Sequence, residues 1–363
     1  MRMSCLLGCF VVLGCFRAAP QSWVAQQSHT SASLRGISAV NAKVAWASGT
    51  HGTYVRTVDG GEHWEAAVVP GAEQLDFRDV EAFDADTAIL LASGPGEKSR
   101  IYSTADGGRN WKLVARPSNA KSFWDCLAFY DRRHGFLLGD PVDGKFELMA
   151  TYDGGDHWEQ PALTGPLGEK LLSPLPGEGA FAASGTCIAA KGPYLSGDVV
   201  TPRIWFGTGG AATARIFSGE LQFAPHPAPL AAGAPSAGVF SIAFTSAPLR
   251  SDKDHLEGIA VGGDYARPGV AENNVALSHD SGETWQPIPG PQPHGYRSAV
   301  AYVRGHREVV AVGTNGSDYS RDGGNSWRAL DNENYNSVSF AGGGAGWAVG
   351  PNGRIAKWTR RSR

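Results

Sequence analysis

The chain has 363 residues and a formal net charge of −3, with 32 Lys and Arg against 35 Asp and Glu. No long run of Lys and Arg occurs, which argues against nucleic acid or an anionic membrane as the main partner. The histidines show no metal-ligand spacing, and no P-loop, dinucleotide or Gly-x-Ser-x-Gly motif follows a strand and opens a helix, so we expect neither a metal nor a cofactor.

The first sixteen residues form an apolar run with a single early Arg2. This pattern predicts a secretory signal at residues 1–19, cleaved near Ala18 or Ala19. The phrase Val12-Leu-Gly-Cys15 is also typical of a bacterial lipobox, which would shorten the signal to residues 1–14 and place a lipid anchor on Cys15. Both alternatives predict an exported protein: periplasmic, extracellular or an outer-surface lipoprotein. No later apolar run is long enough for a membrane helix.

A short phrase built from a hydroxyl residue, Asp, Gly and Trp occurs five times in the chain. Its copies are Thr57-Val-Asp59-Gly-Gly-Glu-His-Trp64, Thr104-Ala-Asp106-Gly-Gly-Arg-Asn-Trp111, Thr151-Tyr-Asp153-Gly-Gly-Asp-His-Trp158, Ser278-His-Asp280-Ser-Gly-Glu-Thr-Trp285 and Ser320-Arg-Asp322-Gly-Gly-Asn-Ser-Trp327. The aspartates are 47, 47, 127 and 42 positions apart. A period of this length, built from short strands, predicts the blades of a β-propeller.

The composition of the phrase is that of a tight turn between two strands. The Asp carboxylate can accept from backbone N–H groups just ahead of it, and Gly takes the positive φ that a side chain would resist. The phrase resembles the Asp-box of bacterial-neuraminidase repeats. We therefore expect Asp59, Asp106, Asp153, Asp280 and Asp322 to be structural residues on the rim rather than catalytic ones.

A second repeated signal, a short apolar strand that ends in Gly, allows the blades to be counted. It occurs seven times, as in Trp46-Ala-Ser-Gly49 and Trp347-Ala-Val-Gly350. The wide gap between boxes then holds a fourth blade with a degenerate box and two long loops, 161–179 and 224–238. The predicted fold is all-β: one seven-bladed propeller over residues 22–358, followed by a basic tail at 359–363.

The two ends of the chain are expected to meet in the seventh blade. That blade has three strands up to about Trp358 and no fourth strand after them. The segment that begins Ser22-Trp23 resembles the residues that follow each box, as in His63-Trp64. We therefore expect the N-terminal strand to be the outer strand of blade seven and to close the ring, which removes two exposed sheet edges.

Three of the five cysteines, Cys5, Cys9 and Cys15, belong to the predicted signal. Cys126 and Cys187 occupy the same place in the innermost strands of blades three and four. In an oxidising compartment they can form a disulfide, and otherwise they are buried thiols.

Propellers carry functional residues where the innermost strands begin, around the mouth of the central channel. Strand alternation and the seven-fold repeat place one residue of each blade in a ring there. The predicted ring is Arg35, Arg78, Trp124, Ser184, Phe240, Arg297 and Asn336.

Three arginines converging on one mouth would form a receptor for a carboxylate or a phosphate. Flat side chains opposite them would add apolar contact area. With their neighbours, the candidate binding residues are Arg35, Arg78, Trp124, Asp125, Phe240, Tyr296, Arg297 and Asn336. The alternative is that the arginines pair with Asp79 and Asp125 and close the channel as a structural plug.

Four phrases of the chain carry a resemblance to a known family: Ser122-Phe-Trp-Asp-Cys-Leu, Asp140-Pro-Val-Asp-Gly-Lys-Phe, Phe181-Ala-Ala-Ser-Gly-Thr and Gly262-Gly-Asp-Tyr. They resemble exported bacterial propellers related to the photosystem II stability/assembly factor, over about residues 33–358. The resemblance implies a non-enzymatic propeller that binds other proteins during assembly of a complex, with an arginine-rich patch as one contact. On that analogy Arg35, Arg78 and Arg297 are the contact residues.

A second hypothesis is a sialidase-like glycoside hydrolase that uses the same mouth. Arg35, Arg78 and Arg297 would stand for the arginine triad, and Tyr335 or Tyr296 for the nucleophile. Asp79 or Asp125 would be the acid. The missing Phe-Arg-Ile-Pro phrase and the seven blades, where sialidases have six, count against it, so we expect a protein-binding scaffold without enzymatic activity.

Overall fold

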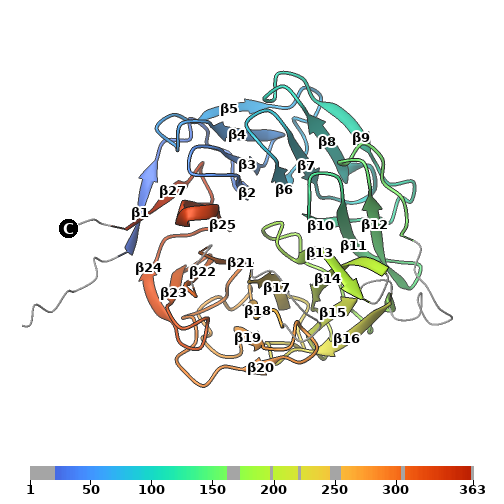
Figure 1. Cartoon of the computed structure of the whole chain (residues 1–363), viewed down its shortest axis with the longest axis vertical. Coiled ribbons are helices and arrows are strands. Elements are labelled where there is room, and N and C mark those ends of the chain that lie inside the picture. Colours follow the sequence, from blue (N-terminus) through green and yellow to red (C-terminus); the bar gives the residue numbers. More distant parts are fainter. Residues whose placement is uncertain are drawn as a thin grey trace, which may run out of the picture.

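The computed structural model describes residues 21–161, 172–196, 199–219, 222–245, 255–303 and 307–360. Within them the chain forms seven antiparallel sheets arranged as a ring (Figure 1). The predicted seven-bladed all-β propeller is therefore confirmed. The predicted signal at 1–19, with its possible lipid anchor, lies outside the described residues, as do positions 361–363 of the basic tail.

The first three sheets follow chain order from the channel outward. Blade one contains β2 (Leu34–Ala39), β3 (Ala45–Gly49), β4 (Thr53–Thr57) and β5 (Glu65–Val68). Blade two contains β6 (Phe77–Ala82), β7 (Ala88–Ala92), β8 (Arg100–Thr104) and β9 (Lys112–Ala115), with a 3-10 turn η1 (Gly96–Lys98) before β8. Blade three contains β10 (Trp124–Phe129), β11 (Gly135–Val142) and β12 (Lys145–Thr151).

The remaining sheets complete the ring. Blade four contains β13 (Ile188–Ser196), β14 (Val199–Thr208), β15 (Arg215–Gly219) and β16 (Phe223–Pro227). Blade five contains β17 (Ala237–Phe244), β18 (Gly258–Asp264), β19 (Val275–Ser278) and β20 (Gln286–Pro287). Blade six contains β21 (Ala299–Tyr302), β22 (Val309–Gly313), β23 (Gly316–Ser320) and β24 (Arg328–Asp331). Blade seven contains β25 (Ser337–Phe340), β26 (Gly346–Val349), β27 (Ile355–Arg360) and β1 (Gln21–Gln26), with a 3-10 turn η3 (Gly342–Gly344) before β26.

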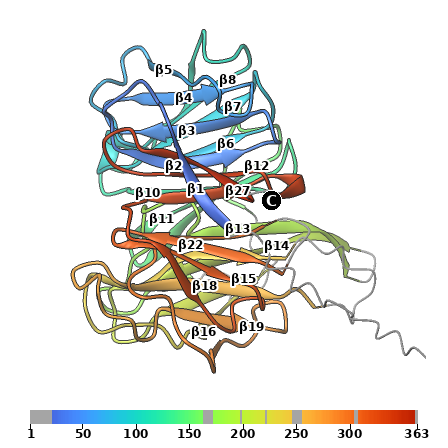
Figure 2. The same ribbon diagram turned by 90° about the vertical axis from the view of Figure 1, so that its left-hand side faces the viewer.

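The ring closes through the N-terminal strand, as the sequence predicts. β1 pairs antiparallel with β27 over six residues, with Trp23 opposite Trp358. Figure 2 shows β1 in blue lying along β27 in red. The two indole rings are 4.9 Å apart edge to face, and Trp23 Nε1 donates to Ser317 Oγ of blade six. Closure thus also ties blade seven to its neighbour and covers the outer edge of β27 with β1.

Blade three differs from the expected four strands because its outer strand is reduced to one bridge, between Ala150 and Glu159. Pro161 follows two residues later and, having no N–H, cannot extend the ladder.

The core lies between neighbouring blades rather than at the ring centre. Large side chains from the second strands fill these layers: Trp46, Trp205 and Trp347 are fully buried. Trp46 packs with Phe77 and Leu90 of blade two, and Trp347 with Leu34 and Val55 of blade one. Each interface buries apolar side chains from two blades, which makes the ring a continuous rigid frame for its channel.

Candidate functional site

A β-bulge near the start of the innermost strand decides which residues face the channel. In four blades, the pairing of the innermost strand with the second strand leaves one residue without a partner. These unpaired residues are Arg35 in β2, Arg78 in β6, Asp125 in β10 and Phe240 in β17. A bulge inserts one extra residue, so positions three apart come to lie on the same face. The burial pattern agrees, since Arg35 and Ser38 in β2, and Arg78 and Glu81 in β6, are the half-buried residues of their strands.

This register corrects the predicted ring in three blades. Trp124 pairs with Gly139 at the place that Leu34 and Phe77 hold in blades one and two, so Asp125 is the ring residue of blade three. In blade six the first paired residue of β21 is Ala299, and Ser298 directly precedes it and donates its N–H to the Val312 carbonyl. Ser298 therefore holds the ring position that was predicted for Arg297. By the same register Thr186 replaces Ser184 in blade four. The observed ring is Arg35, Arg78, Asp125, Thr186, Phe240, Ser298 and Asn336.

Two of the predicted arginines do come together at this end of the channel, hereafter the first mouth. Asp76, just before β6, is their common partner: Arg78 Nε lies 3.0 Å from Asp76 Oδ2 and Arg35 Nε 3.5 Å from Asp76 Oδ1. Arg78 Nη1 also donates to the Ala182 carbonyl at 3.0 Å. The two side chains remain 30% and 31% exposed. Two guanidinium groups against one carboxylate leave a local excess of positive charge that solvent can reach.

The third arginine does not join them, and its predicted place on the mouth is wrong. Arg297 is fully buried and forms an ion pair with Asp318, which is 1% exposed. Its Nη1 donates to the Tyr296 carbonyl and to Asn315 Oδ1, both at 2.7 Å. The one-residue register difference turns this side chain into the blade interior, where its charge is balanced and no ligand can reach it.

Trp124 and Asn336 are likewise structural in their observed places. Trp124 is 1% exposed and packs against Ile89, Leu91 and Leu127 between blades two and three. Asn336 Nδ2 donates to the Leu34 carbonyl at 2.7 Å, which joins blade seven to blade one.

A segment of chain, residues 180–186, enters the channel ahead of β13 and is called the plug below. Ser184 Oγ donates to the Ser298 carbonyl of blade six at 2.8 Å, and the Ser184 carbonyl accepts from Ser337 Oγ of blade seven at 3.0 Å. Figure 1 shows the green chain before β13 reaching toward the ring centre. The sequence predicts an inner strand here; the chain instead crosses the channel, as hydrogen bonds to opposite blades require.

Further contacts hold the plug to blades two and five. Thr186 Oγ1 donates to Ser241 Oγ at 2.7 Å, and the Phe181 ring stacks on Phe240 with centroids 3.9 Å apart. Gly185 has φ +77°, and a Cβ there would overlap the Asp79 carboxylate. Only glycine meets both demands at this position. The channel is therefore closed by main chain rather than by arginines, which corrects the predicted arginine plug.

A disulfide joins Cys126 of β10 to Cys187, the residue that follows the plug. Their Cα atoms are 6.0 Å apart, across the interface of blades three and four. The cystine anchors one end of the plug to the ring. Of the two alternatives that the sequence left open, a disulfide or two buried thiols, the structure has the disulfide.

Two buried carboxyl groups flank the plug. Asp79 is 6% exposed and accepts the backbone N–H groups of Leu127 at 2.6 Å and Val80 at 2.7 Å. Burial outweighs these bonds and raises its pKa to about 7. Burial, with the nearby Asp140 carboxyl, raises the pKa of Asp125 well above its ordinary value, while Arg78 opposes the shift. Both groups are thus held neutral more readily than a surface aspartate.

The described residues do not assemble the sialidase-like arrangement. Arg297 is separated from Arg35 and Arg78 by its burial. Tyr335, 2% exposed, packs on Trp23, and burial raises its pKa. Tyr296 is 4% exposed beneath Phe240 and Tyr265, and burial raises its pKa too. Neither phenol is presented to a substrate or poised to lose its proton.

The box aspartates lie on the opposite rim, where each stabilises its own hairpin. Asp59 Oδ1 accepts from Thr57 Oγ1 at 2.9 Å and from the His63 N–H at 3.0 Å. Gly61 N–H in turn donates to Thr57 Oγ1. The same bonds recur around Asp106, Asp153, Asp280 and Asp322. Hydrogen bonds to the ionised form lower the pKa of Asp153 to about 2.

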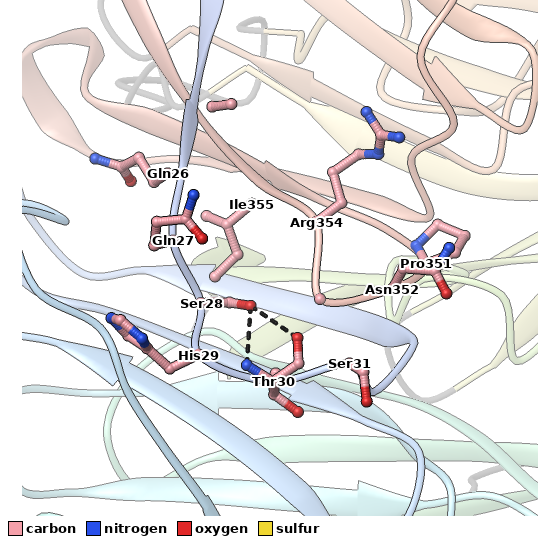
Figure 3. Close-up of a pocket in the computed structure, with 12 residues that line it drawn as sticks. Gln26, Gln27, Ser28, His29, Thr30, Ser31, Pro351, Asn352, Arg354 and Ile355 are labelled. Carbon is pink, nitrogen blue, oxygen red and sulfur yellow. Dashed lines mark hydrogen bonds between the residues drawn. The ribbon is translucent and has the colours of Figure 1, made fainter.

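A hollow of about 540 Å³ lies beside the closing strand, between residues 25–31 and 351–355 (Figure 3). Ser28 Oγ donates to the Thr30 carbonyl at 3.3 Å, and Gly353 N–H donates to the Ala32 carbonyl. Arg354 is paired with Glu333. Because Ser28, Gly353 and Arg354 already have partners within the protein, we assign this hollow to the packing of two turns.

Sequence reasoning missed two parts of the first mouth. Asp76 was not singled out, although an acid two residues before Arg78 can reach that arginine. The plug was placed in an inner strand because its phrase stands where the other blades have one. Among the described residues no helix is long and apolar enough to cross a membrane, and no three His, Cys, Asp or Glu side chains gather so as to hold a metal ion.

Comparisons with known proteins agree with the fold. No protein-family model matches the chain, and no curated protein matches it. The solved structure "YCF48 bound to D1 peptide" is similar over 95% of this chain and 100% of its own, with a TM-score of 0.59 and 17% identity. YCF48 from Cyanidioschyzon merolae is similar over 93% and 98%, with a TM-score of 0.60 and 18% identity. The resemblance stated from the sequence is thus confirmed for the propeller fold.

Proposed function

We propose that this chain is an exported, non-enzymatic propeller that binds a protein partner at its first mouth. The observation that carries the proposal is the pair Arg35 and Arg78 sharing the single carboxylate of Asp76. The fold likeness to a YCF48 structure with a bound peptide supports it by analogy. We favour partner recognition over catalysis because the candidate nucleophiles, Tyr296 and Tyr335, are buried.

The chemistry of the pair indicates what the partner presents. A guanidinium has five N–H donors, and Arg78 uses its Nε and Nη1 within the protein. The donors left on both arginines suit a carboxylate, which guanidinium groups bind in a bidentate, charge-assisted manner. An acidic side chain or a free C-terminus of the partner would therefore dock beside the plug.

A different observation supports the proposed export. A disulfide between Cys126 and Cys187 is typical of proteins that fold in an oxidising compartment. It supports a periplasmic, extracellular or outer-surface location and agrees with the expected signal at 1–19. Fractionation of cells and N-terminal sequencing of the mature protein test this; a chain that starts at Met1 in the cytosol would contradict it, and lipid labelling of Cys15 would show the anchored form.

The binding proposal is tested by cross-linking and co-purification from the native host, with wild-type protein and the double variant Arg35→Ala/Arg78→Ala. Arg267→Ala is the matched control, because Arg267 is a 66% exposed arginine paired with its own Asp264. We expect the double variant to lose the partner while it remains folded, and the control to retain it. Retention by a folded double variant would overturn the arginine site.

The competing enzymatic hypothesis has its own assay. Fluorogenic sialosides and neutral β-glycosides are incubated with the mature protein and with a Tyr335→Phe/Asp125→Asn variant. We expect no turnover above buffer for either protein. Turnover by the wild type that the variant loses would replace the scaffold by a glycoside hydrolase.

A further inference from the structure

An exposed tyrosine lies in the loop between β18 and β19, residues 265–274. Tyr265 is 52% exposed, the most exposed of the large hydrophobic side chains in the described parts of the chain. β18 ends at Asp264, which pairs with Ala237 at the start of β17, so the loop leaves the sheet at the first-mouth end of the channel. Single exposed apolar side chains are common on protein surfaces, so the surroundings of Tyr265 decide whether it takes part in binding.

Hydrogen bonds hold this loop in one place. The Tyr265 N–H donates to the Ser236 carbonyl at 3.2 Å, and the Pro268 carbonyl accepts from the Tyr296 N–H at 2.9 Å. These bonds do not use the Arg267 side chain, so Arg267→Ala leaves them intact and remains a control for the first mouth. A fixed loop loses little conformational freedom when a partner binds. Tyr265 is therefore an aromatic side chain presented to solvent from a rigid support.

Three aromatic rings form a layer at the first mouth. Phe181 of the plug stacks on Phe240, and Tyr265 meets Phe240 edge to face with centroids 6.1 Å apart. A Cβ on Gly209 or Gly238 would lie 2.7 Å or 2.9 Å from Cε2 of the Phe181 ring, so glycines at both positions let this ring sit close to the backbone. Phe240 is buried, whereas Phe181 is partly exposed. The layer thus presents two of its rings, Phe181 and Tyr265, to solvent.

The plug joins this layer to the arginine pair. Arg78 Nη1 donates to the Ala182 carbonyl at 3.0 Å, and Ala182 directly follows Phe181 in the chain. Arg35 shares the Asp76 carboxylate with Arg78. An extended chain advances about 3.3 Å per residue, so a partner segment can reach both parts of the mouth with side chains a few positions apart.

The neighbouring charges indicate which side chain suits the aromatic layer. A cationic side chain can bind to aromatic faces, but here it would meet two guanidinium groups that share one carboxylate. A second carboxylate would lose its hydration against rings that return no hydrogen bond. An aromatic side chain has neither penalty, and it gains stacked or edge-to-face contacts along with buried apolar area. Tyr and Arg are also the residues that most often dominate binding at protein interfaces.

We propose that the first mouth recognises a partner segment in which an aromatic side chain lies within a few positions of a carboxylate. The inference rests on the proposed function: Arg35 and Arg78 bind the carboxylate, and Phe181 and Tyr265 contact the aromatic side chain. The carboxylate belongs to an acidic side chain or to a C-terminus, since both present the same pair of oxygens to a guanidinium group.

Saturation-transfer NMR of the full mature protein tests the proposal with synthetic peptides as probes. The peptide Ac-Gly-Ser-Phe-Glu-Ser-Gly-amide places Phe beside an acidic side chain, and Ac-Gly-Ser-Gly-Ser-Phe-Gly with a free carboxylate places Phe beside a C-terminus. In the comparison peptides Ala or Lys replaces Phe. The protein variants are Tyr265→Ala, Tyr265→Phe and Arg35→Ala/Arg78→Ala. Tyr152→Ala is the matched control, because Tyr152 is a 47% exposed tyrosine in a box hairpin on the opposite rim.

We expect saturable binding of at least one Phe peptide, with the strongest saturation on the protons of its ring. Tyr265→Ala should weaken this binding about tenfold, whereas Tyr265→Phe, which keeps the ring, and Tyr152→Ala should leave it unchanged. The Ala peptide should bind to the wild type about tenfold more weakly than the Phe peptide. Tyr265→Ala should weaken the Ala peptide little further, because the two rings act as a pair.

Three results would overturn the inference: no saturable binding of either Phe peptide, equal binding of the Lys and Phe peptides, or equal binding of the Ala and Phe peptides. These comparisons use the wild type alone, so they hold even if a variant fails to fold. Loss of binding in the arginine variant with no change in folded Tyr265→Ala would also overturn it, while the proposed function stands. A folded arginine variant that binds the Phe peptide like the wild type would contradict both.

Discussion

Aspartates have different surroundings in two regions of the molecule. In the box hairpins on the rim they are partly exposed, and in the wall of the channel they are buried. On the rim, Asp153 receives all its bonds from residues within four positions of itself and remains partly exposed, and its pKa falls to about 2. In the channel, Asp79 bonds across blades to Leu127 and touches Gly185, and its pKa rises to about 7. The same side chain thus stabilises a local turn in one place and depends on the assembled ring in the other.

The arginines repeat this contrast within the channel itself. Arg35 and Arg78 are about one-third exposed around Asp76, whereas Arg297 and Asp318 are buried. An exposed pair is weakened by water and salt, but a buried charge that loses its partner is strongly unfavourable. Four perturbations therefore test how far stability depends on the channel rather than on the rim.

The largest effect is expected at Arg297. Replacement by Met leaves Asp318 buried without its main partner and should lower the free energy of unfolding by about 3–5 kcal/mol. The matched change Arg35→Met should cost less than about 1 kcal/mol. Urea denaturation of the two variants provides the comparison. Equal losses would show that Arg297 is no more buried than the mouth arginines.

The second effect is a dependence on pH that has opposite signs in the two regions. Asp79 has a raised pKa, so folding binds a proton between pH 3.8 and about 7, and stability falls as the pH rises through this window. The loss from this group is up to roughly 4 kcal/mol. Asp153 has a lowered pKa, so its contribution is present above pH 3.8 and is lost as the pH falls toward 2.

Asp79→Asn tests the channel half of this prediction. The variant should flatten the decline between pH 4 and 7, at the cost of about 1 kcal/mol for the one N–H that Asn cannot accept. Asp125 contributes in the same direction, because burial raises its pKa as well. Denaturation curves at intervals of half a pH unit measure both proteins; parallel curves would refute the assignment to Asp79.

Removal of the disulfide comes next in size. Cys126→Ser/Cys187→Ser should lower stability by about 2–4 kcal/mol, chiefly by freeing the unfolded chain. Because Cys187 directly follows the plug and is tied to Cys126, hydrogen exchange should speed up at residues 180–186 and stay unchanged in the box hairpins. Equal acceleration in both regions would mean that the cystine stabilises the ring as a whole, without a special role at the plug.

The smallest effect belongs to the rim. Asp322→Ala removes bonds to Ser320 and Ser326 and should cost about 1 kcal/mol, with faster exchange confined to its own hairpin. Asp156→Ala, which breaks an exposed pair with Lys112, is the control and should change stability by less than about 0.5 kcal/mol. Loss of partner binding in Asp322→Ala would link rim and channel and so contradict their independence.

The fold could be read from the chain because its signals are local and repeated. Each box contains the donors and acceptors of its own turn, and the apolar second strands mark each blade. Ring closure followed from a missing strand at one end and a matching segment, around Trp23, at the other. Half of the candidate binding residues could also be placed, since Arg35, Arg78, Phe240 and Asn336 hold the ring positions expected for them.

The rest depended on contacts between residues far apart in the chain. A bulge shifts the register by one residue, and no local pattern shows that the inner strand skips Asp125 rather than Trp124. The same uncertainty placed Arg297 on the wrong face. Asp76 became the partner of two arginines only because the ring sets blades one and two side by side.

The amino-acid sequence by itself determined the blade count, the box turns and the closing strand, since these depend on residues within one repeat or on the count of repeats. The tertiary structure decided which arginines reach solvent, how the cystine forms and what closes the channel. The physical reason is that hydrogen bonds from Ser184 to blades six and seven, and burial of Asp79 beneath Gly185, exist only once all seven blades surround the plug.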